Sequence, residues 1–226
     1  MDIQHFYIEK GQGEPLILLH GNGEDSSYFT GQIDEFSRTY HVFAIDSRGH
    51  GKTARGSMPF TIRQFAEDLL AFLDAHQIER AHLLGFSDGG NIAMIFAIRH
   101  PDRVEKLILD GANLDPGGVK RTTQLPIEIG YRIAGKFAAK SISARRNMEM
   151  LALMVNDPFI PPEELHQIQA KTLVIAGNHD VIKKEHTKLI ASSIPGAELV
   201  WLKGNHYVAK SHPKEFNRVV LEFLQR

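Results

Sequence analysis

The sequence predicts an α/β fold with a mostly parallel central sheet, helices on both faces of that sheet, and a short helical insertion. Three observations support this prediction. Short apolar runs of strand length alternate with longer segments of helical periodicity along the 226 residues. Most of these runs are apolar at consecutive positions, which is typical of parallel strands that are buried on both faces. One segment, residues 113–168, contains no clear strand and interrupts the alternation.

Seven segments are predicted as strands. The first, residues 3–9, alternates in polarity and therefore suits an edge strand. The other six suit the buried interior of the sheet, and they are residues 15–20, 42–45, 81–86, 104–109, 172–176 and 197–202. Helical patterns lie between and after these runs, at residues 63–77, 91–99 and 213–225.

Residues 113–168 are predicted to form two or three helices. An apolar row at i,i+4 spacing indicates an amphipathic helix, and its members are Leu125, Ile129, Ile133 and Phe137. Pro126 is interpreted as a helix-start residue. A second helix is expected over residues 141–155, and a short third one at Glu163–Glu164. We expect this insertion to be a lid over the carboxyl ends of the strands, with residues 1–112 and 169–226 as the core.

Composition excludes several classes of protein. The chain has 26 basic and 27 acidic side chains, so its net charge of −1 gives no reason to expect a nucleic-acid partner. It has no cysteine, which removes disulfides, thiol catalysis and zinc fingers. The longest unbroken apolar run is residues 92–98, far shorter than a membrane span, and the N-terminus has no basic signal region. We therefore expect a cytoplasmic protein without a membrane partner.

The sharpest motif is Gly85-Phe86-Ser87-Asp88-Gly89, which follows a predicted strand and opens a predicted buried helix. This is the context that a G-x-S-x-G nucleophile elbow requires. A tight turn there holds the serine in a strained backbone conformation, and side chains at the two glycine positions would collide with neighbouring chain. The serine hydroxyl then lies over a helix N-terminus, which favours negative charge. The alternative interpretation is an ordinary turn.

A serine hydroxyl needs a base to take its proton, and the base needs an orienting acid. Asp180 and His206 each follow a predicted strand, and the chain order Ser, Asp, His is the one expected for this architecture. We therefore predict that Ser87, His206 and Asp180 form a catalytic triad. Asp110 also ends a strand and is the alternative acid, whereas the neighbouring His179 is interpreted as a loop residue.

Acyl transfer also needs two N–H donors for the developing oxyanion. The expected donors are the backbone of Asp88 and that of Asn22, which lies in the His20–Gly23 segment after a predicted strand. Because the backbone would act, the side chain of Asn22 is expected to be free to vary. Asp88, Gly21 and Tyr207 are further candidates for substrate contact. The alternative interpretation of this segment is a glycine-rich turn.

A second glycine-rich stretch, residues 46–53, ends in Gly-Lys-Thr and superficially suggests a phosphate-binding loop. That motif needs glycine where Asp46 stands, and it needs a helix directly after Thr53. A loop is expected there instead, and a carboxylate would repel a triphosphate. We therefore do not expect nucleotide binding.

Taken together, the motifs H-G-N-G, D-S-R-G-H-G-K-T, G-F-S-D-G-G, G-N-H-D and G-N-H-Y resemble the α/β-hydrolase superfamily over essentially the whole chain. The S-D-G-G elbow resembles small serine esterases of the valacyclovir-hydrolase-like group. The resemblance implies the triad and the oxyanion hole given above. We expect no cofactor and no metal. Two departures are Thr53, where serine is usual, and the compact insertion, which predicts a shallower or more open pocket.

The expected function is hydrolysis of a small-molecule carboxylic ester through an acyl-enzyme. The same triad also suits a lactone, a thioester, a C–C bond or perhydrolysis, and a ligand-sensing protein with slow turnover is a further alternative.

The charge of the substrate is open: Asp88 would attract an ammonium group, whereas residues 117–147 carry seven basic side chains and one acidic. That segment has a charge of +6 and the remainder of the chain −7. We interpret the cationic segment as a solvated helix face.

Overall fold

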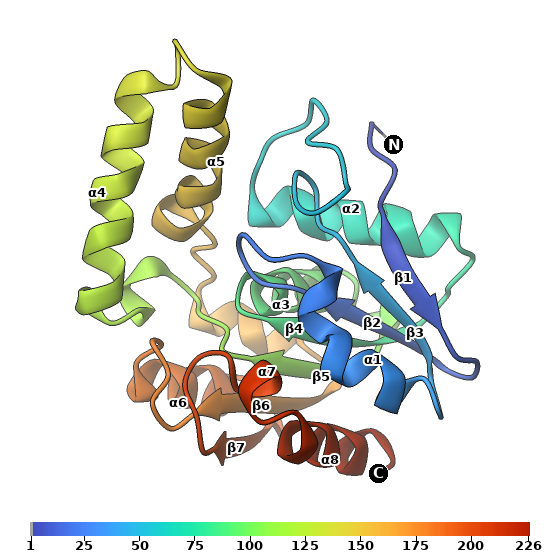
Figure 1. Cartoon of the computed structure of the whole chain (residues 1–226). Helices are drawn as coiled ribbons and strands as arrows, with labels where there is room; N and C mark the ends of the chain where they lie inside the picture. The colour runs from blue at the N-terminus through green and yellow to red at the C-terminus, as the bar shows by residue number, and fades with distance from the viewer. Residues whose placement is uncertain (1) are drawn as a thin grey trace.

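The computed structural model describes residues 2–226 and confirms the predicted α/β class. Its sheet has seven strands in the order β1-β3-β2-β4-β5-β6-β7, and only β1 is antiparallel to its neighbour (Figure 1). The strands are β1 (Tyr7–Lys10), β2 (Pro15–Leu19), β3 (His41–Ile45), β4 (Ala81–Phe86), β5 (Val104–Asp110), β6 (Lys171–Gly177) and β7 (Glu198–Leu202).

Helices cover both faces of the sheet. They are η1 (Ser26–Phe29), α1 (Thr30–Phe36), α2 (Ile62–Ala75), α3 (Asp88–Arg99), η2 (Pro101–Arg103), η3 (Pro116–Gly118), α4 (Arg121–Phe137), α5 (Ile142–Asn156), η4 (Pro162–Gln167), α6 (Lys184–Ser193), α7 (Val208–Ser211) and α8 (Pro213–Leu224). One core cluster joins α2, α3 and α6 to the sheet, and a second joins α1, α7 and α8 to its other face. The sequence patterns did not predict α1, α6 and α7.

The middle of the sheet is buried because its strands are apolar on both faces. All six residues of β4 are buried, and α3 packs beside it with buried side chains around most of its circumference. The edge strand differs from its prediction because β1 begins at Tyr7 rather than at residue 3. One more backbone hydrogen bond precedes this start, from Asp46 N–H to Phe6 O at 2.9 Å, but the Phe6 N–H donates to the Thr53 hydroxyl at 2.9 Å instead of to β3.

The α4–α5 hairpin, residues 121–156, lies between β5 and β6 in the chain and stands to one side of the sheet (Figure 1). The prediction that Pro126 starts this helix is wrong. Helix α4 begins at Arg121 and runs through the proline. Proline has no N–H, so the helix loses one internal hydrogen bond at this position and continues on its other contacts. Helix α5 packs beside Gly130 and Gly135, where an added Cβ would meet Leu151 Cδ1 at 3.4 Å and Met148 Sδ at 3.8 Å, which are ordinary van der Waals distances.

The apolar row of α4 faces solvent. Leu125, Ile129, Ile133 and Phe137 are 41–56% exposed, whereas Gln124 and Ala134 are the buried side chains of this helix. The i,i+4 pattern predicted the helix and its amphipathic character. It did not predict that the apolar row lies opposite the packed side.

Residues 46–53 form a turn held by the Asp46 carboxylate, which accepts hydrogen bonds from the backbone N–H groups of Ser26 (2.7 Å) and Lys52 (2.8 Å). A phosphate-binding loop would require a helix directly after Thr53, but residues 54–61 form none. Within residues 2–226, no helix is both long enough and apolar enough to cross a membrane.

Candidate active site

Ser87 lies at the sharp turn between β4 and α3 with φ 53° and ψ −118°, a backbone conformation that is strained for a residue with a side chain. The flanking glycines make this turn possible. A Cβ on Gly85 would lie 2.2 Å from the carbonyl oxygen of Gly89, and a Cβ on Gly89 would lie 2.0 Å from that of Leu19. Both contacts are impossible, so the G-x-S-x-G spacing is a steric requirement of this turn.

Three side chains that are far apart in the sequence form a hydrogen-bonded chain. His206 Nε2 lies 3.1 Å from Ser87 Oγ, and His206 Nδ1 lies 2.7 Å from Asp180 Oδ1. Asp180 Oδ1 also accepts the backbone N–H of Ile182 at 2.9 Å. The carboxylate therefore accepts a hydrogen bond from Nδ1–H, which leaves Nε2 as the acceptor that faces the serine hydroxyl.

Asp110, the alternative acid, ends β5 and is completely buried. Neither of its carboxyl oxygens has a hydrogen-bond partner among residues 2–226. Burial, together with the nearby Asp180, raises the pKa of the Asp110 carboxyl well above its usual range. Burial therefore disfavours the charged form of Asp110, which is the form that would stabilise an imidazolium. Its backbone carbonyl instead accepts the N–H of Ser87 at 2.8 Å.

The predicted oxyanion donors lie on two adjacent segments beside Ser87. Within residues 2–226, the backbone N–H groups of Asn22 and Asp88 donate to no other group, so both remain available. His20 holds the first segment: its Nδ1 bonds to Gly21 O at 2.8 Å, and its Nε2 accepts the N–H of Ser47 at 3.0 Å. Burial lowers the pKa of the His20 imidazole to about 4, which keeps it neutral in this role.

The side chain of Asn22 is not free to vary, which corrects the expectation from sequence. Its Nδ2 donates to Asp88 Oδ2 and to the backbone carbonyl of Met150 on α5, both at 3.0 Å. A second contact joins the same helix to the core, because Arg55 Nη2 lies 2.7 Å from Glu149 Oε1. Asn22 therefore ties the predicted oxyanion segment to the α4–α5 hairpin.

A cavity of about 200 Å³ opens at Ser87 between the sheet and the α4–α5 hairpin. Its lining residues are Asn22, Glu24, Phe86, Ser87, Asp88, Asn113, Val119, Thr123, Gln124, Ile127, Leu153, Met154, Val181, Ile182, His206 and Tyr207. Most of the solvent-exposed surface of this lining is apolar. Glu24 and Asp88 are its two acidic side chains, and among the described residues no lysine or arginine lines it.

Asp88 follows the nucleophile directly and is buried at the floor of this cavity. Burial raises the pKa of the Asp88 carboxyl to about 6, although the hydrogen bond from Asn22 acts in the opposite direction. The folded protein therefore binds a proton at Asp88 more tightly than the unfolded chain does. Between about pH 4 and pH 6, this single group makes folding less favourable as pH rises.

We expect Asp88→Asn to stabilise the protein at neutral pH by about 1–3 kcal/mol, because an amide avoids the cost of a buried charge and still accepts from Asn22. The difference from wild type should shrink to near zero at about pH 4, where the carboxyl is protonated in both states. Urea unfolding of wild type and Asp88→Asn at pH 7 and at about pH 4 measures this difference in the free energy of unfolding. The lowered pKa of His20 affects the stability of both proteins equally, so it cancels in the difference between them. A difference independent of pH would contradict the buried-charge explanation.

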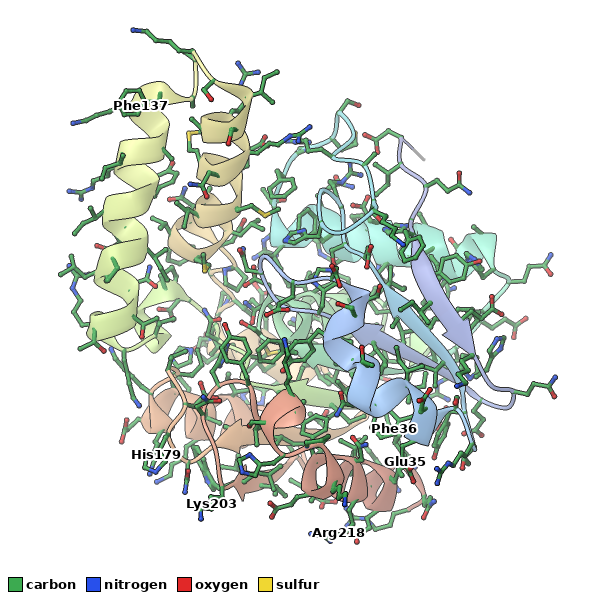
Figure 2. All side chains as sticks on the ribbon, viewed as in Figure 1. Glu35, Phe36, Phe137, His179, Lys203 and Arg218 are labelled. Carbon is green, nitrogen blue, oxygen red and sulfur yellow. The ribbon has the colours of Figure 1, made fainter. Side chains whose placement is uncertain are left out.

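The other sequence candidates fall at different places. Tyr207 lines the cavity and is 45% exposed. Gly21 does not line the cavity and packs against Phe86, where a Cβ would lie 2.9 Å from the ring. His179 is exposed and lies at the lower edge of the molecule in Figure 2.

Sequence reasoning missed two polar pairs that shape the cavity. Asn91 and Asn113 exchange hydrogen bonds, and Asn113 lines the cavity. Gln124 Nε2 donates to the carbonyl of Met154 at 3.0 Å. For Asn91 and Gln124, the one signal was a polar residue within an apolar helical pattern; Asn113 lies in the loop after β5 and had none.

Comparison with known proteins identifies the family of the chain. Residues 14–150 match the model of the alpha/beta hydrolase fold family, and the chain belongs to this family. Among curated relatives, it is 30% identical to a 2-hydroxy-6-oxononadienedioate/2-hydroxy-6-oxononatrienedioate hydrolase from Burkholderia vietnamiensis, over 100% of this chain and 92% of that protein. It is 28% identical to 2-hydroxymuconate semialdehyde hydrolase from Pseudomonas putida, over 96% and 89%.

Solved structures give the same result. A hydrolase from Pseudomonas aeruginosa PA01 is 28% identical and superposes with a TM-score of 0.81, over 98% of this chain and 94% of that one. Est816, described as an N-acyl homoserine lactone degrading enzyme, is 27% identical with a TM-score of 0.81, over 98% and 97%. The family and the hydrolase character of its relatives make this chain an alpha/beta hydrolase.

Proposed function

We propose that this protein is a serine hydrolase that cleaves a small carboxylic ester through an acyl-enzyme intermediate. The observation that carries the proposal is the hydrogen-bonded chain from Ser87 through His206 to Asp180, whose serine end opens into the cavity. In this role Ser87 is the nucleophile, His206 the general base and acid, and Asp180 the orienting acid.

The mechanism follows from the positions of the protons. Ser87 Oγ attacks the ester carbonyl while its proton passes to His206 Nε2, and the negative charge develops on the carbonyl oxygen. The free N–H groups of Asn22 and Asp88 stabilise that oxygen. His206 then gives its proton to the leaving alcohol, and the acyl group stays on Ser87. Water attacks the acyl-enzyme with His206 again as base, which releases the acid and restores the serine.

The size and charge of the cavity favour a compact, uncharged or cationic substrate. At about 200 Å³, it is smaller than the range of about 300–1,000 Å³ typical of drug-sized ligand sites. The Burkholderia vietnamiensis relative is named for dicarboxylate substrates, whose charges need cationic partners. Here the charged lining residues are Glu24 and Asp88, so C–C cleavage of a dicarboxylate is disfavoured.

Lactone hydrolysis is the second candidate. A lactone is a cyclic ester and requires the same nucleophile, base and oxyanion donors. The likeness to Est816, with its stated action on N-acyl homoserine lactones, favours it. Steady-state assays on p-nitrophenyl esters of graded acyl length and on a lactone series distinguish the two. An enzyme should reach kcat of about 1–10³ s⁻¹ on its substrate, and turnover far below this on every ester and lactone would favour the ligand-sensing alternative.

The Asp88 carboxylate should give a modest preference for a cationic acyl group, because it lies in the cavity directly after the nucleophile. The test compares kcat/KM for an alanine ester and for the matching propionate ester, which lacks the amine. Asp88→Asn is expected to reduce the alanine-to-propionate ratio by about three- to tenfold at a pH above 6, where the carboxyl is ionised. An unchanged ratio would show that the carboxylate has no part in substrate choice.

A further inference from the structure

The outer face of α4 carries an apolar surface that the active site does not explain. We call Leu125, Ile129, Ile133 and Phe137 the outer stripe; each is 41–56% exposed. Ile142, at the start of α5, extends it at the tip of the hairpin and is 73% exposed. Figure 2 shows Phe137 at the end of α4 that lies away from the sheet.

The opposite side of the same helix serves the active site. Thr123, Gln124 and Ile127 line the cavity, and Ala134 is buried against the hairpin partner. A helix that packs on one side normally presents a polar face to solvent. The outer stripe is instead a continuous apolar row over four turns, and exposed apolar surface of this kind marks a binding surface.

Unpaired cations surround the outer stripe. Exposed basic side chains lie along α4 and around the hairpin tip, and they are Arg132, Lys136, Lys140 and Arg145. None of them forms an ion pair with an acidic side chain within residues 2–226. Residues 117–147 carry a charge of +6 against −7 for the remainder of the chain. The molecule is therefore an electric dipole with the hairpin at its positive end.

We propose that the outer stripe docks on an anionic lipid surface. Leu125, Ile129, Ile133 and Phe137 enter the boundary between headgroups and acyl chains, and the flanking lysines and arginines contact the phosphate groups. An apolar helical face with aromatic and aliphatic residues and basic flanks is the arrangement that binds such surfaces. The acidic body is repelled by the same surface, so the hairpin approaches first.

Charge argues against a second copy of the chain as the occupant. A symmetric pairing of two outer stripes places the same patch against itself, and therefore brings two segments of +6 charge together. An anionic surface neutralises this charge instead. The sequence-based expectation of no membrane partner rested on the lack of a run long enough to span a bilayer. Docking on the surface needs no such run.

The test is co-sedimentation with large vesicles. Wild-type protein should bind vesicles of phosphatidylglycerol and phosphatidylcholine in equal parts, and bind phosphatidylcholine alone about tenfold more weakly. Ile129→Ser/Ile133→Ser should reduce binding to the mixed vesicles by about tenfold. The matched control is Met58→Ser/Leu189→Ser, two comparably exposed apolar residues outside the stripe, which should bind like wild type. Unchanged kcat/KM on a soluble ester verifies that both variants are folded.

Three results would overturn the proposal. In the first, wild-type protein stays in the supernatant with both kinds of vesicle. In the second, the Ile129→Ser/Ile133→Ser variant binds the mixed vesicles as well as wild type does. In the third, light scattering finds a wild-type dimer that the same variant converts to a monomer, which would make a second copy the occupant. None of these results bears on the proposed ester hydrolysis.

Discussion

Ser87→Ala is expected to lower kcat on the best ester substrate by about 10⁵–10⁶-fold, because it removes the atom that forms the acyl bond. The fold should persist, since alanine fits the same turn and the glycines at 85 and 89 supply the space that the turn needs. His206→Ala should cost nearly as much. Among residues 2–226, His206 Nε2, 3.1 Å from Ser87 Oγ, is the only group that hydrogen-bonds to the serine hydroxyl.

The double variant Ser87→Ala/His206→Ala provides the sharper test, because residues that act as a unit have non-additive effects. It should be only slightly slower than either single variant. The measurement is single-turnover and steady-state kinetics of the three variants on one p-nitrophenyl ester, with circular dichroism as a check of folding. Losses that multiply in the double variant would mean that the two residues act in separate steps.

Asp180→Asn is expected to lower kcat by about 10³–10⁴-fold. The carboxylate accepts the Nδ1 proton of His206 at 2.7 Å and thereby holds Nε2 as the acceptor toward Ser87. An amide can instead present its NH₂ group to Nδ1, which favours the tautomer with the proton on Nε2. That tautomer cannot accept the serine proton.

Asp110→Asn is the matched control, since Asp110 ends β5, Asp180 follows the adjacent strand β6, and both changes replace a carboxyl by an amide of equal size. The Asp110 carboxyl is fully buried without a hydrogen-bond partner among residues 2–226, and burial raises its pKa, so an amide of the same size avoids the cost of burying a charge there. Most activity should remain, within about threefold of wild type. The reverse ranking of the two variants would make Asp110 the orienting acid.

Those parts of the site that depend on local chain geometry could be predicted from sequence. The Gly85–Gly89 spacing around Ser87 has one steric solution between a strand and a helix, and the structure shows that turn. Asp180 and His206 both follow strands of a parallel sheet, whose carboxyl ends share one edge. That rule predicts their proximity to Ser87 without knowledge of the side chains between them.

Features that depend on which distant segments meet could not be predicted. The Asn22 side chain is held by the carbonyl of Met150, a contact between residues 128 positions apart that no local pattern encodes. The α4 periodicity showed an apolar row but not its direction, because periodicity is the same whether the row faces a core or solvent. Helix α6 was missed because its sequence is polar and its burial rests on three residues, Thr187, Ile190 and Ser193.

Covalent labelling tests the central claim most directly. Ser87 should be the nucleophile because its hydroxyl lies at the strained elbow, within hydrogen-bond reach of His206. The protein is treated with a fluorophosphonate, and the product is analysed by intact-mass spectrometry and peptide mapping. We expect one adduct per chain, on Ser87, and none in Ser87→Ala. An adduct that persists in Ser87→Ala, or that maps to another residue of the wild-type protein, would contradict the assignment.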